Sequence, residues 1–291
     1  ILLILKNVHK SLLLLAMGIS FSTAFILSKR LQLIFEAEDV KLKIFDALNL
    51  TFIGYFFNNF LPTSVGGDIV KVLCASRITK KPVKCVTSVL LDRIFGLFTF
   101  VLIPSVTLLF YSKQIGNPAV PILTYSLLFF SLAFFVLLFN RGMARKFRFV
   151  EPILKFIRLH EKVRQVYDGM NNFRNHKAVV AEALLLSLIG QSINILVIYF
   201  MALALGSTAN VTYFYLLVPV VHLLSMLPSL GGLGIRELGY VGFLGPIMGK
   251  EAAIALGFLW LLQLLLMSLA GGIIYLVRPD YHVRFKEAQA V

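Results

Sequence analysis

Two short motifs gather most of the residues in this sequence that could bind a charged ligand. They read Asn58-Asn59-Phe-Leu-Pro62-Thr-Ser-Val-Gly66-Gly67-Asp68 and Met226-Leu-Pro228-Ser-Leu-Gly231-Gly232-Leu-Gly234-Ile-Arg236-Glu237. Both contain Leu-Pro, a serine, a Gly-Gly pair and an acid. Proline removes a backbone N–H and glycine relaxes a helix, so each motif predicts a helix break. A helix that restarts after the break presents free N–H groups and a positive dipole end, which suits a phosphate or a carboxylate.

Ionisable residues occur beside these motifs and inside an apolar run. They are Asp68, Asp92, Arg93, Arg236 and Glu237. Each costs roughly 2.5–3.5 kcal/mol at the centre of a membrane helix, so we expect them to pair or to face a cavity. The adjacent Asp92 and Arg93 could form a structural ion pair, bind a headgroup, or do both. For the glycine clusters, the alternative to a binding role is close helix packing.

The composition predicts the surroundings of these residues. Apolar residues make up 58% of the 291 residues, charged residues only 14%, and the mean hydropathy is +0.86. A soluble domain is about 25% charged, so a soluble globular enzyme, a disordered tail and a disulfide scaffold are excluded. The net charge of +14 comes from basic clusters between apolar runs, which fits an anionic membrane surface better than nucleic acid.

Apolar runs near 20 residues long predict an all-α polytopic integral membrane helix bundle. The expected spans are Ser11–Ser28, Ile44–Phe60, Val83–Tyr111, Ala119–Phe139, Ala178–Ala204, Val211–Leu227 and Ala252–Val277. Shorter helices are expected at Asp68–Arg77 and Ile235–Leu244.

The distribution of Lys and Arg predicts the orientation of these spans. Arg141–Lys177 has ten basic residues against three acids, and Arg77–Lys84 has four against none, so both loops should be cytoplasmic. The two motifs must then enter the membrane and return to the same side, from opposite sides of the bilayer. About seven spanning helices would frame two Pro/Gly-broken re-entrant helices in an inverted-topology repeat, which points to a transporter's midplane site.

The expected organisation has four parts. Residues 1–140 form the first membrane repeat plus an extra helix, 141–177 a basic amphipathic cytoplasmic connector, 178–280 the second repeat, and 281–291 a cytoplasmic tail. By the same orientation argument Ser11–Ser28 runs from outside to inside, so a cytoplasmic N-terminus would require one more helix upstream, which fits the absence of an initial Met. The connector is expected to lie on the membrane surface or to dock on the bundle or a partner.

The paired motifs, together with Leu91-Asp92-Arg93, resemble the transmembrane domain of lysylphosphatidylglycerol synthases and its standalone flippase-like relatives. The resemblance covers most of the chain. It implies a lipid flippase, since this domain moves aminoacylated phosphatidylglycerol to the outer leaflet in the synthases. It also implies membrane lipids as partners: an anionic or aminoacylated phospholipid or an isoprenoid-linked glycolipid. No stretch resembles the soluble aminoacyltransferase domain, so a separate lipid-modifying enzyme would supply the lipid.

We therefore expect a multi-pass protein of a prokaryotic inner (plasma) membrane that moves a lipid headgroup through a polar midplane cavity. The expected headgroup-binding residues are Asn58, Asn59, Pro62, Gly66, Gly67, Asp68, Asp92, Arg93, Pro228, Gly231, Gly232, Gly234, Arg236 and Glu237. Arg93 and Arg236 would bind the phosphate. We expect no enzymatic activity, cofactor, metal or nucleic acid. The alternatives are a small-solute secondary transporter and a non-transporting anchor for a glycosyltransferase or lipid-modifying enzyme.

Four further polar residues have a structural interpretation. His222 is expected to be a hydrogen-bonded core residue, with a proton relay as the alternative. Gln191 and Asn194 are expected to join helices. Lys71 is expected to be a topology marker at the cytoplasmic face, like Arg77.

Overall fold

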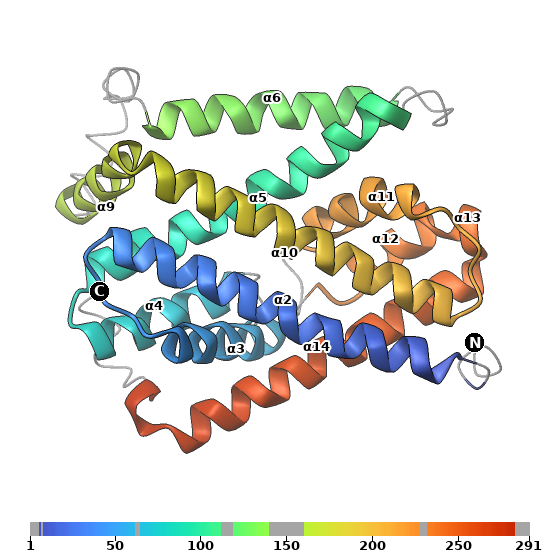
Figure 1. Ribbon diagram of the computed structural model, residues 1–291, viewed down its shortest axis with the longest axis horizontal. Helices are drawn as coiled ribbons and strands as arrows, with labels where there is room; N and C mark the ends of the chain where they lie inside the picture. The colour runs from blue at the N-terminus through green and yellow to red at the C-terminus, as the bar shows by residue number, and fades with distance from the viewer. Residues whose placement is uncertain are drawn as a thin grey trace.

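The computed structural model describes residue 6 and residues 8–61, 65–111, 119–139, 160–226 and 232–282, all of them helical or in connecting segments (Figure 1). The all-α fold class is confirmed. The helices are α2 (Lys10–Ala37), α3 (Ile44–Phe60), α4 (Gly66–Thr79), α5 (Pro82–Tyr111), α6 (Ala119–Phe139), α9 (His160–Asn172), α10 (Lys177–Ala204), α11 (Val211–Leu224), α12 (Ile235–Phe243), α13 (Gly245–Met248) and α14 (Lys250–Val277), with 3-10 turns η3 (Phe173–Asn175) and η4 (Pro279–Tyr281).

Within the described ranges, four helices are long and apolar enough to cross a membrane. They are α2, α5, α10 and α14, with 28, 30, 28 and 28 residues. At 1.5 Å per residue a 28-residue helix is about 42 Å long, which exceeds the ~30 Å hydrocarbon core. All four run obliquely along the long axis of the molecule (Figure 1), so the long axis is the expected membrane normal. The protein is thus a multi-pass membrane bundle.

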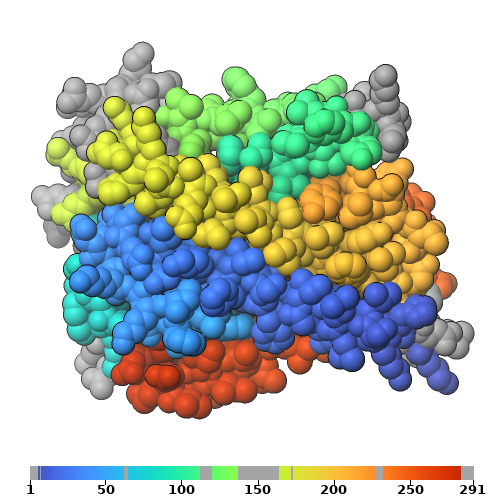
Figure 2. Space-filling model, in the orientation of Figure 1, coloured from blue at the N-terminus to red at the C-terminus, as the bar shows by residue number. Residues whose placement is uncertain are grey.

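Helices from the two halves of the chain pack on one another. The longest interface joins α2 to α10, where Gly190 lies against the Leu27 side chain. Helix α3 packs against α14, and α11 packs against α5. Figure 2 shows α2 and α10 crossing one face of the molecule, with α6 on one side of them and α14 on the other.

Two helix pairs approach the centre of the molecule from opposite ends. Helices α3 and α4 occupy one end, and α11, α12 and α13 occupy the other (Figure 1). We call these pairs the first hairpin (α3–α4) and the second hairpin (α11–α12). The expected breaks fall between the two helices of each pair. Helix α4 begins at Gly66, so the first Gly-Gly pair opens the helix rather than preceding it.

Helix α2 is longer than the sequence predicted. It continues past Ser28 to Ala37, because Ile34 and Phe35 are fully buried and Gln32 bonds Glu36 within the helix. The predicted end at Ser28 was wrong because the charged residues that follow were taken for a loop. Helix α11, in contrast, ends at Leu224, three residues before the expected Leu227.

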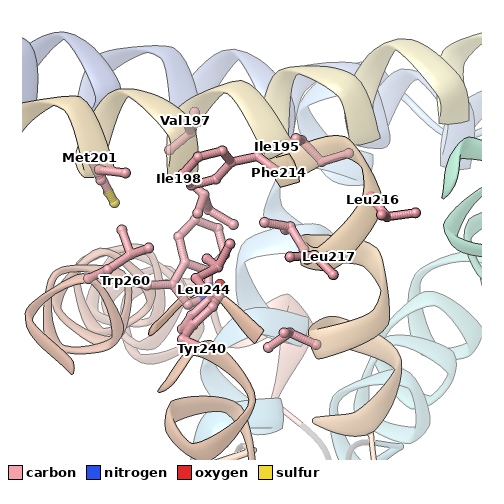
Figure 3. Packing of buried hydrophobic residues seen from close by; sticks show 14 of the residues in the cluster. Ile195, Val197, Ile198, Met201, Phe214, Leu216, Leu217, Tyr240, Leu244 and Trp260 are labelled. Carbon is pink, nitrogen blue, oxygen red and sulfur yellow. The ribbon is translucent and has the colours of Figure 1, made fainter. Parts of the chain in front are cut away.

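The largest buried cluster lies in the second half of the bundle. Figure 3 shows residues of α10, α11, α12 and α14 converging there, with Tyr240 and Trp260 among them. We call the end of the molecule that carries the α4–α5 turn and α9 the basic end. There Met170 of α9 and Phe173 of η3 are buried against α2 and α5. This part of the predicted connector therefore docks on the bundle, while its residues 141–159 lie outside the described residues.

Candidate functional site

A cavity of about 350 Å³ lies where the two hairpins meet, and we call it the central cavity. Its wall comes from seven helices (α2, α3, α5, α10, α11, α12 and α14), which contribute both polar and apolar side chains. The polar and aromatic lining residues are Ser20, Thr23, Arg30, Tyr55, Asn58, Asn59, Asp92, Arg93, Phe100, Gln191, Asn194, His222, Ser225, Arg236, Trp260 and Gln263. The ends of α3 and α11 and the start of α12 thus face one polar space.

The first hairpin places Asp68 between two cations. Asp68 Oδ1 lies 3.2 Å from Lys71 Nζ one turn further along α4, and Oδ2 pairs with Arg93 of α5. Lys71 is buried and packs against Gly54 of α3. The missing side chain at Gly54 makes room for it, since a Cβ there would lie 2.2 Å from Lys71 Cε. The interpretation of Lys71 as a surface topology marker was wrong: the side chain belongs to a buried charge cluster.

Asp92 forms a second ion pair beside the first. Arg30 Nε donates to Asp92 Oδ1 at 2.7 Å, and Arg30 Nη1 donates to the Ser187 hydroxyl at 2.8 Å. Arg30 is only 5% exposed and ties together α2, α5 and α10. The neighbours Asp92 and Arg93 are therefore engaged in different ion pairs, each with a different helix.

The second hairpin contains its own ion pair. Arg236 Nη2 lies 2.8 Å from Glu237 Oε1, and Arg236 is 2% exposed. Glu237 Oε2 accepts the backbone N–H of Gly234 at 2.7 Å and so caps the start of α12. Gly232 and Gly234 have φ values of +79° and +83°, which side-chain-bearing residues rarely adopt.

The first hairpin has an equivalent cap. Asn58 Oδ1 accepts the Gly67 N–H at 2.8 Å, so one of the first N–H groups of α4 is already bonded. Asn59 donates to Leu264 O and to Ser268 of α14. In both hairpins a side chain of the motif accepts a backbone N–H at the start of the second helix: Asn58 in the first hairpin and Glu237 in the second.

The structure places five of the fourteen predicted site residues at the central cavity. Asn58, Asn59, Asp92, Arg93 and Arg236 line the central cavity. Six others do not line it: Gly66, Gly67, Asp68, Gly232, Gly234 and Glu237. Of these, Asp68 and Glu237 pair with the lining residues Arg93 and Arg236. Pro62, Pro228 and Gly231 fall outside the described residues.

Sequence reasoning missed Arg30, because the first span was ended at Ser28. A signal was available, since Ser20, Thr23, Leu27 and Arg30 recur at helical spacing and line one face of α2. The predicted core role of His222 fits its contacts: Tyr240 Oη lies 3.3 Å from its Nε2, and its ring stacks on Trp260 at 5.6 Å. His222 nevertheless also lines the cavity, as do Gln191 and Asn194.

The four ion pairs described above carry an excess of positive charge. Among the described residues they comprise four basic groups, Arg30, Lys71, Arg93 and Arg236, and three acids, Asp68, Asp92 and Glu237. A buried unbalanced charge is costly, so this arrangement favours an anionic ligand over a cationic one.

A family model described as "Lysylphosphatidylglycerol synthase TM region" matches residues 1–272 of the chain. No curated protein and no solved structure matches it.

Proposed function

Because the chain belongs to the lysylphosphatidylglycerol synthase TM region family, we propose that it is a flippase that moves a phospholipid or lipid-linked headgroup between leaflets. The headgroup would pass through the central cavity while the acyl or isoprenoid tails stay in the bilayer. The observation that carries this proposal is the excess positive charge on the cavity's ion pairs, which a phosphodiester would neutralise.

Arg93 and Arg236 are the proposed phosphate ligands. Both line the cavity, and they come from opposite hairpins. Arg93 could turn from Asp68 to a phosphate without leaving the carboxylate alone, because Lys71 stays beside it at 3.2 Å. Arg236 could share its five donors between Glu237 and the ligand. Lys71 would then be the counter-ion of Asp68 whenever Arg93 binds the phosphate, which gives a reason for burying a lysine under Gly54.

The reciprocal packing of the two halves supports an inverted repeat. We propose that α2, α3, α4 and α5 correspond to α10, α11, α12 and α14. In this alignment the α3–α14 contact is equivalent to the α11–α5 contact, and both hairpins contribute residues to the same cavity. The repeats would span 1–140 and 178–280, joined by the connector 141–177, with a tail at 281–291. Such repeats place substrate sites near the bilayer midplane.

The basic residues at one end of the molecule support an orientation in the membrane. Positive loops lie on the cytoplasmic side of a membrane, so the end with the α4–α5 turn and α9 is the proposed cytoplasmic end. The proposed setting is a prokaryotic inner membrane. The proposed partners are an anionic or aminoacylated phospholipid or an isoprenoid-linked glycolipid, and a separate enzyme that modifies it.

A reconstitution assay tests the flippase directly. Liposomes containing the full chain and fluorescent phosphatidylglycerol are treated with a membrane-impermeant quencher, and the rate at which inner-leaflet label becomes accessible is measured. Wild type should exceed empty liposomes, and Arg236→Gln should be slower by about tenfold, as expected for losing one charge-assisted contact. Lys177→Gln, an exposed residue at the start of α10, is the matched control and should keep the wild-type rate.

The other outcomes separate the alternatives. Uptake of a soluble anion without lipid movement would indicate a solute transporter. A folded wild-type protein that moves neither lipid nor solute would overturn the transport proposal and favour a membrane anchor.

A further inference from the structure

A second cavity of about 370 Å³ lies at the basic end of the molecule, away from the residues of the central cavity. We call it the basic-end cavity. Its lining residues are Asp46, Arg77, Ile78, Lys80, Arg278, Asp280 and Tyr281. They come from the start of α3, the end of α4 and the segment that follows α14.

The floor of this cavity is rigidly built. Tyr281 is 2% exposed, and its hydroxyl donates to Asp46 Oδ1 at 2.9 Å and accepts from Asn49 at 3.1 Å. Its carbonyl accepts from the Cys74 thiol at 3.1 Å. Burial raises the pKa of Tyr281 to about 12, so the hydroxyl keeps the proton that it donates. These bonds pin the segment after α14 onto α3 and α4.

Three cations line the space above this floor. Arg77 is held in place by a bond from its guanidinium to the His282 carbonyl. Lys80 has φ = +59°, a conformation in which glycine or asparagine is usual at a helix C-terminus. Arg278 follows directly after α14.

The cations exceed the acids in this cavity by one. Asp46 already accepts the Tyr281 hydroxyl, so one of the two carboxylates is partly satisfied. Among the described residues, no carboxylate lies within ion-pair distance of Lys80 or Arg278. The cavity also lies where a spanning helix ends, which is the depth of lipid phosphates.

We propose that the basic-end cavity is a second ligand site, which binds a phosphate group through Arg77, Lys80 and Arg278. The phosphate belongs either to a headgroup of the adjacent leaflet or to a soluble phosphorylated compound. This site is separate from the transport path, and its existence does not depend on flippase activity.

Calorimetric titration of the purified full chain in neutral detergent tests the proposal. The probes are dioctanoyl phosphatidylglycerol, dioctanoylglycerol as its phosphate-free match, and inorganic phosphate. The variants are Lys80→Gln with Arg278→Gln, whose side chains are exposed, and Lys177→Gln as the control. Arg236→Gln identifies binding in the central cavity. A thermal unfolding curve of each variant checks that it is folded.

We expect the double variant to weaken phosphatidylglycerol binding at one site by at least about tenfold, while Arg236→Gln and Lys177→Gln leave that site intact. Dioctanoylglycerol should not bind there. If the double variant loses affinity for inorganic phosphate but not for phosphatidylglycerol, the bound phosphate comes from a soluble compound and the proposal still holds. Wild-type affinity and stoichiometry in the folded double variant, for both phosphate probes, would overturn it.

Discussion

The two hairpins bring similar residues to the central cavity but are held closed in different ways. In the first, the two helices touch backbone to backbone: a Cβ at Gly67 would lie 2.2 Å from the Gly54 carbonyl. Its acid, Asp68, pairs with Arg93 on another helix. In the second, nothing lies within 4 Å of a Cβ at Gly234, and Glu237 bonds its own neighbour and its own helix start.

This difference indicates unequal roles. The first hairpin is fixed by contacts that other helices provide, so it can form a stationary wall of the site. The second hairpin carries its ion pair and its cap with it, so it can shift without breaking either. Three comparisons between substitutions, from the largest expected effect to the smallest, test this contrast.

Asp68→Asn should be the most damaging. It leaves Lys71 and Arg93 without their shared carboxylate, and removing one partner of a buried ion pair costs about 3–5 kcal/mol. Glu237→Gln should cost about 1–2 kcal/mol, since one cation is affected and an amide oxygen can still accept one of the bonds. The measurement is the unfolding equilibrium in mixed detergent micelles. Equal losses would show that both acids cross-link the bundle equally.

Gly67→Ala should lower the free energy of unfolding by about 2 kcal/mol, in the range of overpacked sites. The obstruction is the Gly54 carbonyl, so no side-chain truncation can relieve it. Gly242→Ala in α12 is the matched control, because nothing lies within 4 Å of its Cβ. It should be neutral or stabilising by about 0.5–1 kcal/mol. A harmless Gly67→Ala would contradict the backbone contact.

Gly239→Ala should have the smallest effect, about 1 kcal/mol, and should be rescued in part. In the second hairpin the obstruction is a side-chain atom, Val221 Cγ1 at 2.9 Å. Combining Gly239→Ala with Val221→Ala should therefore cost less than the sum of the two single variants, by about 1 kcal/mol in a double-mutant cycle. Strict additivity would show that the helices of this hairpin do not meet through Val221.

Local sequence features predicted much of the fold. The apolar run Ile44–Phe60 matches the bounds of α3, and both helix breaks fall at the Pro/Gly motifs. These features work because lipid forces apolar composition and internal backbone bonding onto each span. The rule that a span ends where charged residues begin failed at α2. The charged residues after Ser28 lie within a helix that continues to Ala37.

The site was predicted less completely because its partners are distant in the chain. Asp92 was recognised as costly in a membrane, but its partner Arg30 is 62 residues away. The helical spacing of Arg30 with Ser20 and Thr23 was the available signal, and it becomes visible only once α2 is continued past Ser28. The burial of Lys71 depends on the absence of a side chain at Gly54.

The contact between α14 and α3 has a mechanical consequence. A Cβ at Gly271 would lie 1.9 Å from the Phe52 carbonyl, and one at Gly272 would lie 2.8 Å from the Phe56 ring. Helices this close cannot slide past each other without opening a void, so α3 and α14 behave as one fused lever. Alternating access would then require α3 and α14 to rotate together, as one rigid body, relative to the other helices of the bundle.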